Sequence, residues 1–126
     1  MYELTIETVF SAAHAIVIAG QREALHGHDW HVTACIAGEH LDADGLLVDF
    51  HAVEESLHAI LRPFRNANLN ECAPFDRTNP TAEHVARHIA AALDARLRPI
   101  MGEARGVRVA WVRVTESPGC AATYRF

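Results

Sequence analysis

Two histidines separated by one residue precede a run of alternating apolar residues, where they could bind a metal ion. His26 and His28 stand just before the segment 32–36. In a strand, residues i and i+2 point to the same face and lie about 6 to 7 Å apart, which suits two imidazoles that close on one ion. A third histidine, His14, ends an earlier strand-like run, and neighbouring antiparallel strands lie about 4.8 Å apart. Three imidazoles with a free fourth position form the ligand set of a catalytic zinc, whereas structural zinc favours four ligands and cysteine.

Chance is the competing explanation for this pattern. The chain has nine histidines among 126 residues, and such a content produces some His-x-His pairs that bind no metal. The context of His14, four residues after Phe10 in a strand-like segment, favours the metal site.

Length and composition fit one globular domain over residues 1–126. Half of the residues, 50%, are hydrophobic and 21% are charged, which is enough apolar material for a single core. The net charge of −5 gives no basic surface for nucleic acid or for an anionic membrane. No apolar stretch approaches a membrane span, and the acidic Glu3 and Glu7 stand where a signal peptide would be basic, so we expect a cytoplasmic protein. The three dispersed cysteines form no Cys-x-x-Cys pair and are interpreted as ordinary thiols.

Apolar spacing predicts four strands and two helices in the order ββααββ. Strands are expected over residues 2–10, 26–37, 107–116 and 121–126, with a loop over 15–25 and a turn over 102–106. Asp49 is a candidate N-cap for a helix that Pro63 ends, and Asn79 with Pro80 is expected to open the second helix. Strand pairs that flank a helix pair indicate an α+β domain, with the helices on one face of an antiparallel sheet. Its open edges favour oligomerisation.

Five motifs run in order along almost the whole chain: Phe10 to His14, Leu25 to His28, Asp49 with Phe50, Asn79 to Glu83, and Val114 to Cys120. Together they resemble the 6-pyruvoyltetrahydropterin synthase and 6-carboxytetrahydropterin synthase family. The resemblance implies a tunnelling fold, in which trimers close their sheets into a barrel and two trimers stack as a homohexamer with active sites between subunits.

The same resemblance implies a ligand for each part of the site. It implies zinc (Zn2+) on the three histidines already named. It also implies a pterin, 7,8-dihydroneopterin triphosphate or a relative, held by the Glu116 carboxylate with support from Thr81 and Glu83. A surface carboxylate at a strand end is the competing interpretation of Glu116.

The chain departs from this family at the positions that carry its chemistry. Arg22 stands where the family has its catalytic cysteine, and Arg65 and Asn66 replace its Asp-His pair. Neither of the latter can act as a general base near neutral pH, because a guanidinium stays protonated and an amide does not titrate. Glu23, three residues before His26, instead gives a Glu-x-x-His-Gly-His motif. This motif resembles a variant subgroup that cleaves the substrate side chain to give 6-hydroxymethyl-7,8-dihydropterin.

Three functions remain open from the sequence. The first is a zinc-dependent lyase that uses Glu23 as a base on a pterin side chain, against the alternative that Glu23 is only a loop carboxylate. The second is a related enzyme in which Arg65 and Asn66 bind a different substrate, with Arg65 on a phosphate. The third is a non-catalytic binder of a pterin or a purine-like ligand that keeps zinc and Glu116.

Overall fold

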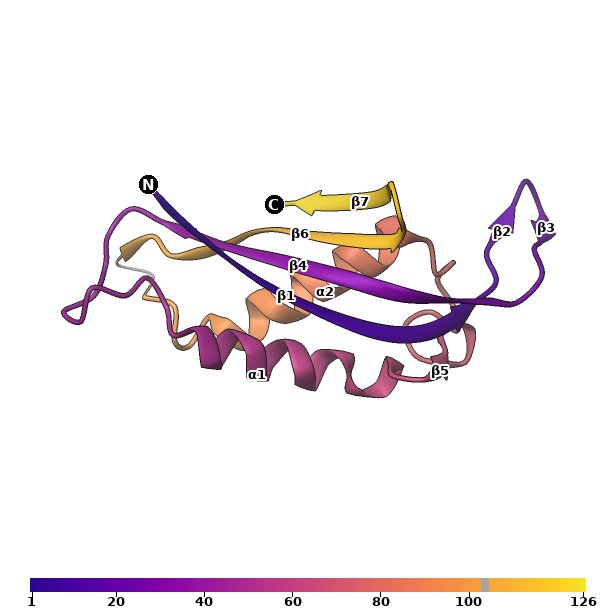
Figure 1. The fold of residues 1–126 in the computed structure, drawn as a ribbon, viewed down its shortest axis with the longest axis horizontal. Helices are drawn as coiled ribbons and strands as arrows, with labels where there is room; N and C mark the ends of the chain where they lie inside the picture. The colour runs from indigo at the N-terminus through magenta and orange to yellow at the C-terminus, as the bar shows by residue number, and fades with distance from the viewer. Residues whose placement is uncertain (103–104) are drawn as a thin grey trace.

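Two helices pack against one face of a five-stranded sheet (Figure 1). The computed structural model describes residues 1–102 and 105–126 and confirms the predicted α+β class. Residues 103 and 104 of the turn expected over 102–106 lie outside the described residues. The strands are β1 (Tyr2–His14), β2 (Val17–Ile18), β3 (Gln21–Arg22), β4 (His26–Gly38), β5 (Ala67–Asn68), β6 (Arg108–Ser117) and β7 (Cys120–Arg125). The helices are α1 (Phe50–Leu61) and α2 (Ala82–Leu97), with short 3-10 turns at Arg62–Phe64 and Leu69–Glu71.

The long β1–β4 pair forms the centre of the sheet. It is antiparallel over its whole length, from Tyr2 opposite Gly38 to His14 opposite His26. The expected alternation holds, because Ile6, Phe10 and His14 are buried on the helix-facing side of β1. The sheet order is β5-β1-β4-β6-β7, so β1 and β6 flank β4 and the last strand, β7, pairs with β6.

One contiguous apolar core fills the space between the sheet and the helices. Its largest fully buried side chains include Trp30, Phe10, Ile36, Leu57, Leu61, Ile89 and Leu93. Burial of apolar side chains of this size stabilises the fold by about 1.5 to 3 kcal/mol each. Among the described residues, no helix combines the length and the apolar character needed to cross a membrane.

The helix starts are defined by side-chain caps, one of which the sequence predicted. Asp49 caps α1, because its carboxylate accepts a hydrogen bond of 2.9 Å from the His51 N–H. The prediction that Asn79 caps the second helix with Pro80 as its first residue is wrong. Thr81 is the N-cap, with its hydroxyl 3.2 Å from the His84 N–H, and α2 begins at Ala82.

Three further details differ from the sequence predictions. Residues 15–25 are not only a loop: β2 and β3 pair as a small hairpin around Ala19 and Gly20, which have φ values of 51° and 79°. The short β5 runs parallel to β1, so the sheet is mixed and this part of the β1 edge is covered. The helical spacing of Phe50, Val53, Leu57, Ile60 and Leu61 in the sequence predicts that Phe50 is buried, but this first residue of α1 is 51% exposed.

Candidate metal centre and active site

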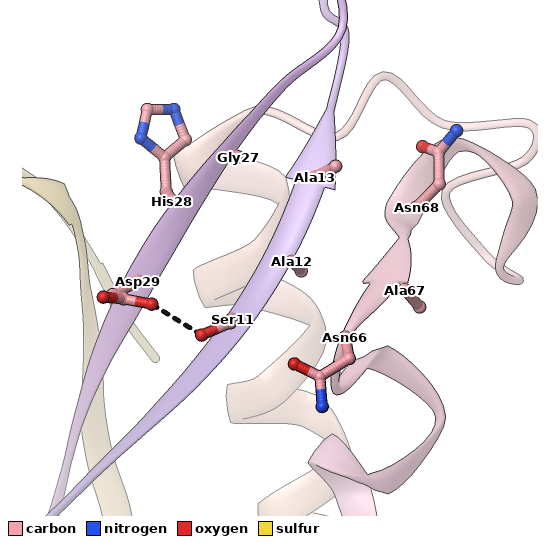
Figure 2. Close-up of a pocket in the computed structure, with 9 residues that line it drawn as sticks. All are labelled: Ser11, Ala12, Ala13, Gly27, His28, Asp29, Asn66, Ala67 and Asn68. Carbon is pink, nitrogen blue, oxygen red and sulfur yellow. Dashed lines mark hydrogen bonds between the residues drawn. The ribbon is translucent and has the colours of Figure 1, made fainter.

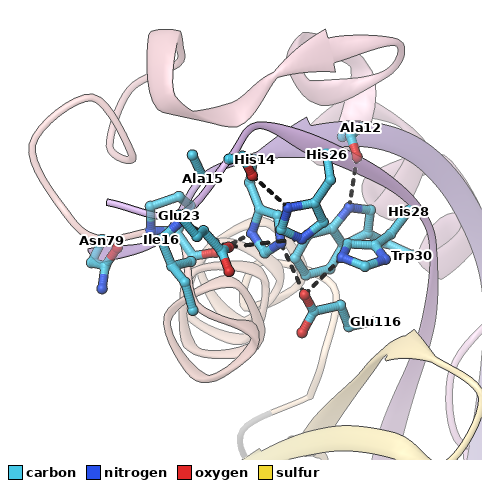
Figure 3. A network of polar contacts seen from close by, with 12 residues as sticks. Ala12, His14, Ala15, Ile16, Glu23, His26, His28, Trp30, Asn79 and Glu116 are labelled. Atoms are coloured by element: carbon cyan, nitrogen blue, oxygen red, sulfur yellow. Dashed lines mark hydrogen bonds and ion pairs between the residues drawn. The ribbon is translucent and has the colours of Figure 1, made fainter. Parts of the chain in front are cut away.

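The end of the β1–β4 pair brings three imidazoles together, as the sequence predicted. His14 lies opposite His26, and His28 lies opposite Ala12, so all three rings project to the same side of the sheet. The ring centroids are 4.8 Å apart for His14 and His26, 5.1 Å for His14 and His28, and 4.7 Å for His26 and His28. The buried Trp30 indole lies beneath them, with its centroid 4.8 Å from that of His14, and donates its N–H to the Ala12 carbonyl. Figure 3 shows this cluster.

Backbone carbonyls determine the orientation of two of these rings. His14 Nδ1 lies 2.8 Å from the Pro80 carbonyl oxygen, and His26 Nδ1 lies 2.8 Å from the Ala24 carbonyl oxygen. Because a carbonyl oxygen can only accept, each Nδ1 must carry the proton it donates. In the neutral rings the lone pairs are therefore on Nε2. A hydrogen bond from Nδ1 to a carbonyl in this way orients a histidine so that Nε2 can bind a metal ion.

Glu116, near the end of β6, completes the cluster. Its Oε1 lies 2.9 Å from His14 Nε2 and 2.9 Å from His28 Nε2. Ligand atoms of the four side chains, the three histidines and Glu116, all lie within 4.8 Å of one another. Among the described residues, the buried Nε2 atoms of His14 and His28 have no partner with hydrogen-bond geometry. Three imidazole nitrogens and one carboxylate oxygen form a donor set that fits zinc, and an ion between them would satisfy both orphaned nitrogens.

Burial also favours the neutral form of the His28 imidazole, which is the form that can bind a metal ion. Desolvation lowers the pKa of His28 below its ordinary value, and the neighbouring Glu116 carboxylate opposes part of that shift.

Glu23 lies at the outer side of this cluster, between β3 and β4. Its Oε1 is 3.7 Å from His26 Nε2 and accepts a hydrogen bond of 3.0 Å from the Ile16 N–H. The Glu23 N–H in turn donates to the Ile16 carbonyl at 3.0 Å. The base of the β2–β3 hairpin therefore holds this carboxylate beside the third imidazole, while about a third of the side chain, 33%, remains accessible.

Glu116 lines two cavities. One of about 390 Å³ is lined by His14, Glu116, Thr81 and Glu83, so two residues expected to support the pterin share it with the cluster. The other, of about 560 Å³, includes His28, Glu116 and the segment Thr115 to Pro118.

Arg65 lies apart from these cavities. It lines a separate cavity of about 370 Å³ with Val9 and His31, and its guanidinium donates to the Val9 carbonyl at 3.0 Å. The adjacent Asn66 has a φ of 55° and donates its N–H to the Ser11 carbonyl. Asn66 also borders an open cavity of about 600 Å³ that reaches His28 (Figure 2).

Two asparagine side chains hold the chain just beyond His14, a role that the sequence analysis missed. Asn70 accepts from the Ala15 N–H and donates to the Ala15 carbonyl, both at 2.8 Å. Asn79 pairs in the same way with Val17, at 2.9 Å in both directions. A carboxamide can serve a peptide group as donor and acceptor together, but the sequence carries no signal for which peptide group it meets.

Sequence comparison finds relatives along nearly the whole chain. The family model of 6-pyruvoyl tetrahydropterin synthase matches residues 3–126. The chain belongs to this family. It is 31% identical over 125 residues to the 6-carboxy-5,6,7,8-tetrahydropterin synthase of Bacillus subtilis (strain 168), covering 94% of this chain and 83% of that protein. It is 29% identical over 112 residues to a putative 6-carboxy-5,6,7,8-tetrahydropterin synthase of Archaeoglobus fulgidus, covering 89% and 85% of the two chains.

Solved structures of family members share the fold. The 6-pyruvoyl tetrahydropterin synthase of Caenorhabditis elegans has a TM-score of 0.79 at 23% identity, covering 100% of this chain and 97% of that one. The Plasmodium vivax enzyme has a TM-score of 0.78 at 21% identity, covering 99% and 97%. The chain therefore has the tunnelling fold of the 6-pyruvoyl tetrahydropterin synthases.

No cysteine stands at the position where the family has its catalytic cysteine. Arg22, at the expected cysteine position, is exposed on β3 next to Glu23. Cys35 is buried within β4, whereas Cys120 is exposed and lines the cavity that contains His14 and Glu116.

Proposed function

We propose that this protein is a zinc-dependent lyase that cleaves the side chain of 7,8-dihydroneopterin triphosphate or a related pterin, with Glu23 as the base. The observation that carries the proposal is the position of the Glu23 carboxylate, 3.7 Å from the inward-facing nitrogen of His26, one of three converging imidazoles. Two solved structures of the Plasmodium vivax 6-pyruvoyltetrahydropterin synthase are mutants of a catalytic glutamate, which supports carboxylate chemistry on this fold.

Each protein group has a defined task in this reaction. A zinc ion held by His14, His26 and His28 would supply Lewis acidity to a side-chain hydroxyl, lowering its pKa as zinc lowers that of bound water to about 7. Glu23 therefore needs to be only a modest base. The Ile16 N–H orients its carboxylate, and the partial exposure of the side chain leaves room for the substrate.

Removal of the hydroxyl proton by Glu23 starts a retro-aldol cleavage. The bond between the first two side-chain carbons breaks, the second carbon becomes an aldehyde, and the electrons of that bond pass into the ring imine. A proton returned to the first carbon, from protonated Glu23 or from water, gives 6-hydroxymethyl-7,8-dihydropterin. No oxidant or reductant is consumed, so the reaction needs no redox cofactor.

The ring is proposed to bind beside Glu116. An ionised carboxylate that faces two adjacent N–H donors of an amino-pyrimidine makes a short, charge-assisted, bidentate contact. The cavity with Thr81 and Glu83 supports this role, because it joins Glu116 directly to His14. The homohexamer and the cytoplasmic location implied by the sequence remain predictions.

Product analysis tests the proposal. Zinc-loaded parent protein incubated with 7,8-dihydroneopterin triphosphate should yield 6-hydroxymethyl-7,8-dihydropterin by mass spectrometry. Glu23→Ala should keep zinc and pterin affinity but lose cleavage. Glu55→Ala, which removes an exposed carboxylate from α1, is the matched control and should retain activity. Full cleavage by Glu23→Ala would assign the base elsewhere.

Loss of the Asp-His pair favours a second candidate function. Arg65 and Asn66 are polar groups at the edges of two open cavities, where they could bind a substrate with a different side chain. Absence of turnover in the parent protein together with retained pterin affinity would instead favour a non-catalytic binder.

A further inference from the structure

Cys120 differs from the other two cysteines of the chain in its surroundings. Cys35 is fully buried within β4, and the thiol of Cys72 donates to the Asn68 carbonyl at 3.3 Å. Cys120 is exposed, and it is the first residue of β7, opposite Ser117 across the turn that joins β6 to β7. A thiol reacts only when a reagent can reach its sulfur, so Cys120 is the cysteine with the best access.

Cys120 shares its cavity with the carboxylate that is proposed to hold the pterin. The cavity of about 390 Å³ is lined by Cys120, Glu116, Glu83 and His14, among others. His14 is 1% exposed, and its Nε2 lies 2.9 Å from Glu116 Oε1 but has no partner with hydrogen-bond geometry among the described residues. A buried ring nitrogen without such a partner indicates that a ligand belongs at this cavity. The thiol therefore borders a binding site, although the sequence around it indicates only an ordinary cysteine.

Little room remains in this cavity once a pterin ring is bound. Cavities that bind small molecules span about 300 to 1,000 Å³, so a cavity of about 390 Å³ is near the lower limit and fits one ring system. A group attached to the sulfur of Cys120 would compete for that space. The backbone cannot easily move the thiol aside, because the residues after it pair with β6, beginning with Ala121 opposite Thr115.

We propose that Cys120 is a thiol modification site, and that a mixed disulfide between it and a small thiol excludes the pterin ring from this cavity. In the exchange, the Cys120 sulfur attacks one sulfur of a small-molecule disulfide such as glutathione disulfide. A new S–S bond joins Cys120 to one half, the original S–S bond breaks, and the other half leaves as a thiolate that takes up the proton released by Cys120. Excess of the reduced thiol reverses the reaction. The inference rests on the pterin specificity proposed above, and it makes pterin binding respond to the thiol–disulfide balance.

Thiol labelling tests whether Cys120 lies at the pterin site. The chromogenic disulfide 5,5′-dithiobis(2-nitrobenzoate) should label one thiol rapidly in the folded parent, and Cys120→Ser should lose this rapid phase. Cys72→Ser is the matched control and should retain it, because Cys72 lies outside the cavity. A concentration of 7,8-dihydropterin about ten times its dissociation constant should slow the rapid phase about tenfold, since only the free site reacts. Glu116→Gln should show less protection at the same concentration.

Pterin binding to the modified protein then tests the exclusion itself. Parent protein that carries the glutathione mixed disulfide should bind 7,8-dihydropterin at least about tenfold more weakly in equilibrium dialysis, and excess reduced glutathione should restore the affinity. Cys120→Ser treated with the same disulfide should keep its affinity, and Cys120→Ala provides a second variant should the serine variant not fold. The zinc content of the modified parent should be unchanged, because Cys120 is not part of the group of clustered metal ligands found among the described residues.

Each contrary result has a distinct meaning. Unchanged pterin affinity of the modified parent, a rapid phase retained in Cys120→Ser, or equal labelling rates with and without 7,8-dihydropterin would overturn this inference while leaving the proposed metal and pterin sites intact. Loss of zinc together with pterin affinity would assign the effect to the metal centre and would also overturn it. Failure of the unmodified, zinc-loaded parent to bind 7,8-dihydropterin at all would overturn the proposed pterin specificity and this inference together.

Discussion

Replacing Asn70 with alanine removes two hydrogen bonds that hold the end of β1 beside the metal cluster. The carboxamide pairs with both the N–H and the carbonyl of Ala15, the residue after His14, at 2.8 Å each. A net contribution of about 0.5 to 1.5 kcal/mol per hydrogen bond gives an expected loss of about 1 to 3 kcal/mol. Because Ala15 is only 4% exposed, water cannot easily replace the lost partner, so the loss should lie in the upper half of that range.

Urea unfolding in the presence of a chelator measures this loss, because the chelator removes the contribution of zinc binding to stability. Asn79→Ala is the matched control. It removes the same pair of bonds from Val17, which is 41% exposed and open to water, so the expected loss is less than about 1 kcal/mol. Asn70→Ala should also bind zinc more weakly, because the backbone that carries His14 is released. Equal losses in the two variants, or a loss below about 0.5 kcal/mol for Asn70→Ala, would refute the reasoning.

Two further predictions concern acid stability and the altered cysteine position. His88 packs against Phe64 and Phe75 on the inner side of α2, and burial lowers its pKa below 6.5. The unfolded chain then binds the proton first, so stability should be complete above about pH 6.5 and should fall as the pH drops below it, by up to about 1.4 kcal/mol per pH unit. His88→Leu should flatten this dependence in unfolding experiments between pH 7 and 5, and an unchanged slope would show that other groups cause it. Arg22→Cys should restore the family's cysteine without 6-pyruvoyl chemistry, because Arg65 and Asn66 still replace the Asp-His pair. Mass spectrometry of the pterin product checks this expectation. Release of triphosphate by that variant together with a 6-pyruvoyl product would contradict it.

The cluster of three histidines was predictable from the sequence because it depends on strand geometry. A period of two places His26 and His28 on one face, and the same alternation carried from Phe10 places His14 on the buried side of β1. The helices were predictable for a similar reason, since the apolar stripes have helical spacing. The faces of these elements follow from local repeats, and only the pairing of β1 with β4, which sets His14 opposite His26, had to be assumed.

Contacts between distant segments were not predictable in the same way. The side chain of Glu116 reaches the imidazoles because the end of β6 pairs with β4. The side-chain conformation of Glu116 decides which group it contacts, and the sequence does not indicate that conformation. Asn79 fits the composition of a helix cap, but its side chain is engaged by Val17, so Thr81 caps the helix instead. The spacing of His84 and His88 in the sequence favours a solvated helix face, but His88 packs against Phe64 and Phe75 from the segment after α1.

The zinc content of purified parent protein and of its histidine variants tests the central claim most directly. The account predicts about one zinc per chain in the parent, because His14, His26 and His28 present converging donors. His26→Ala and His28→Ala should each lose most of that zinc, while His58→Ala, an exposed histidine on α1, should retain it. Unchanged zinc content in both His26→Ala and His28→Ala would contradict the assignment.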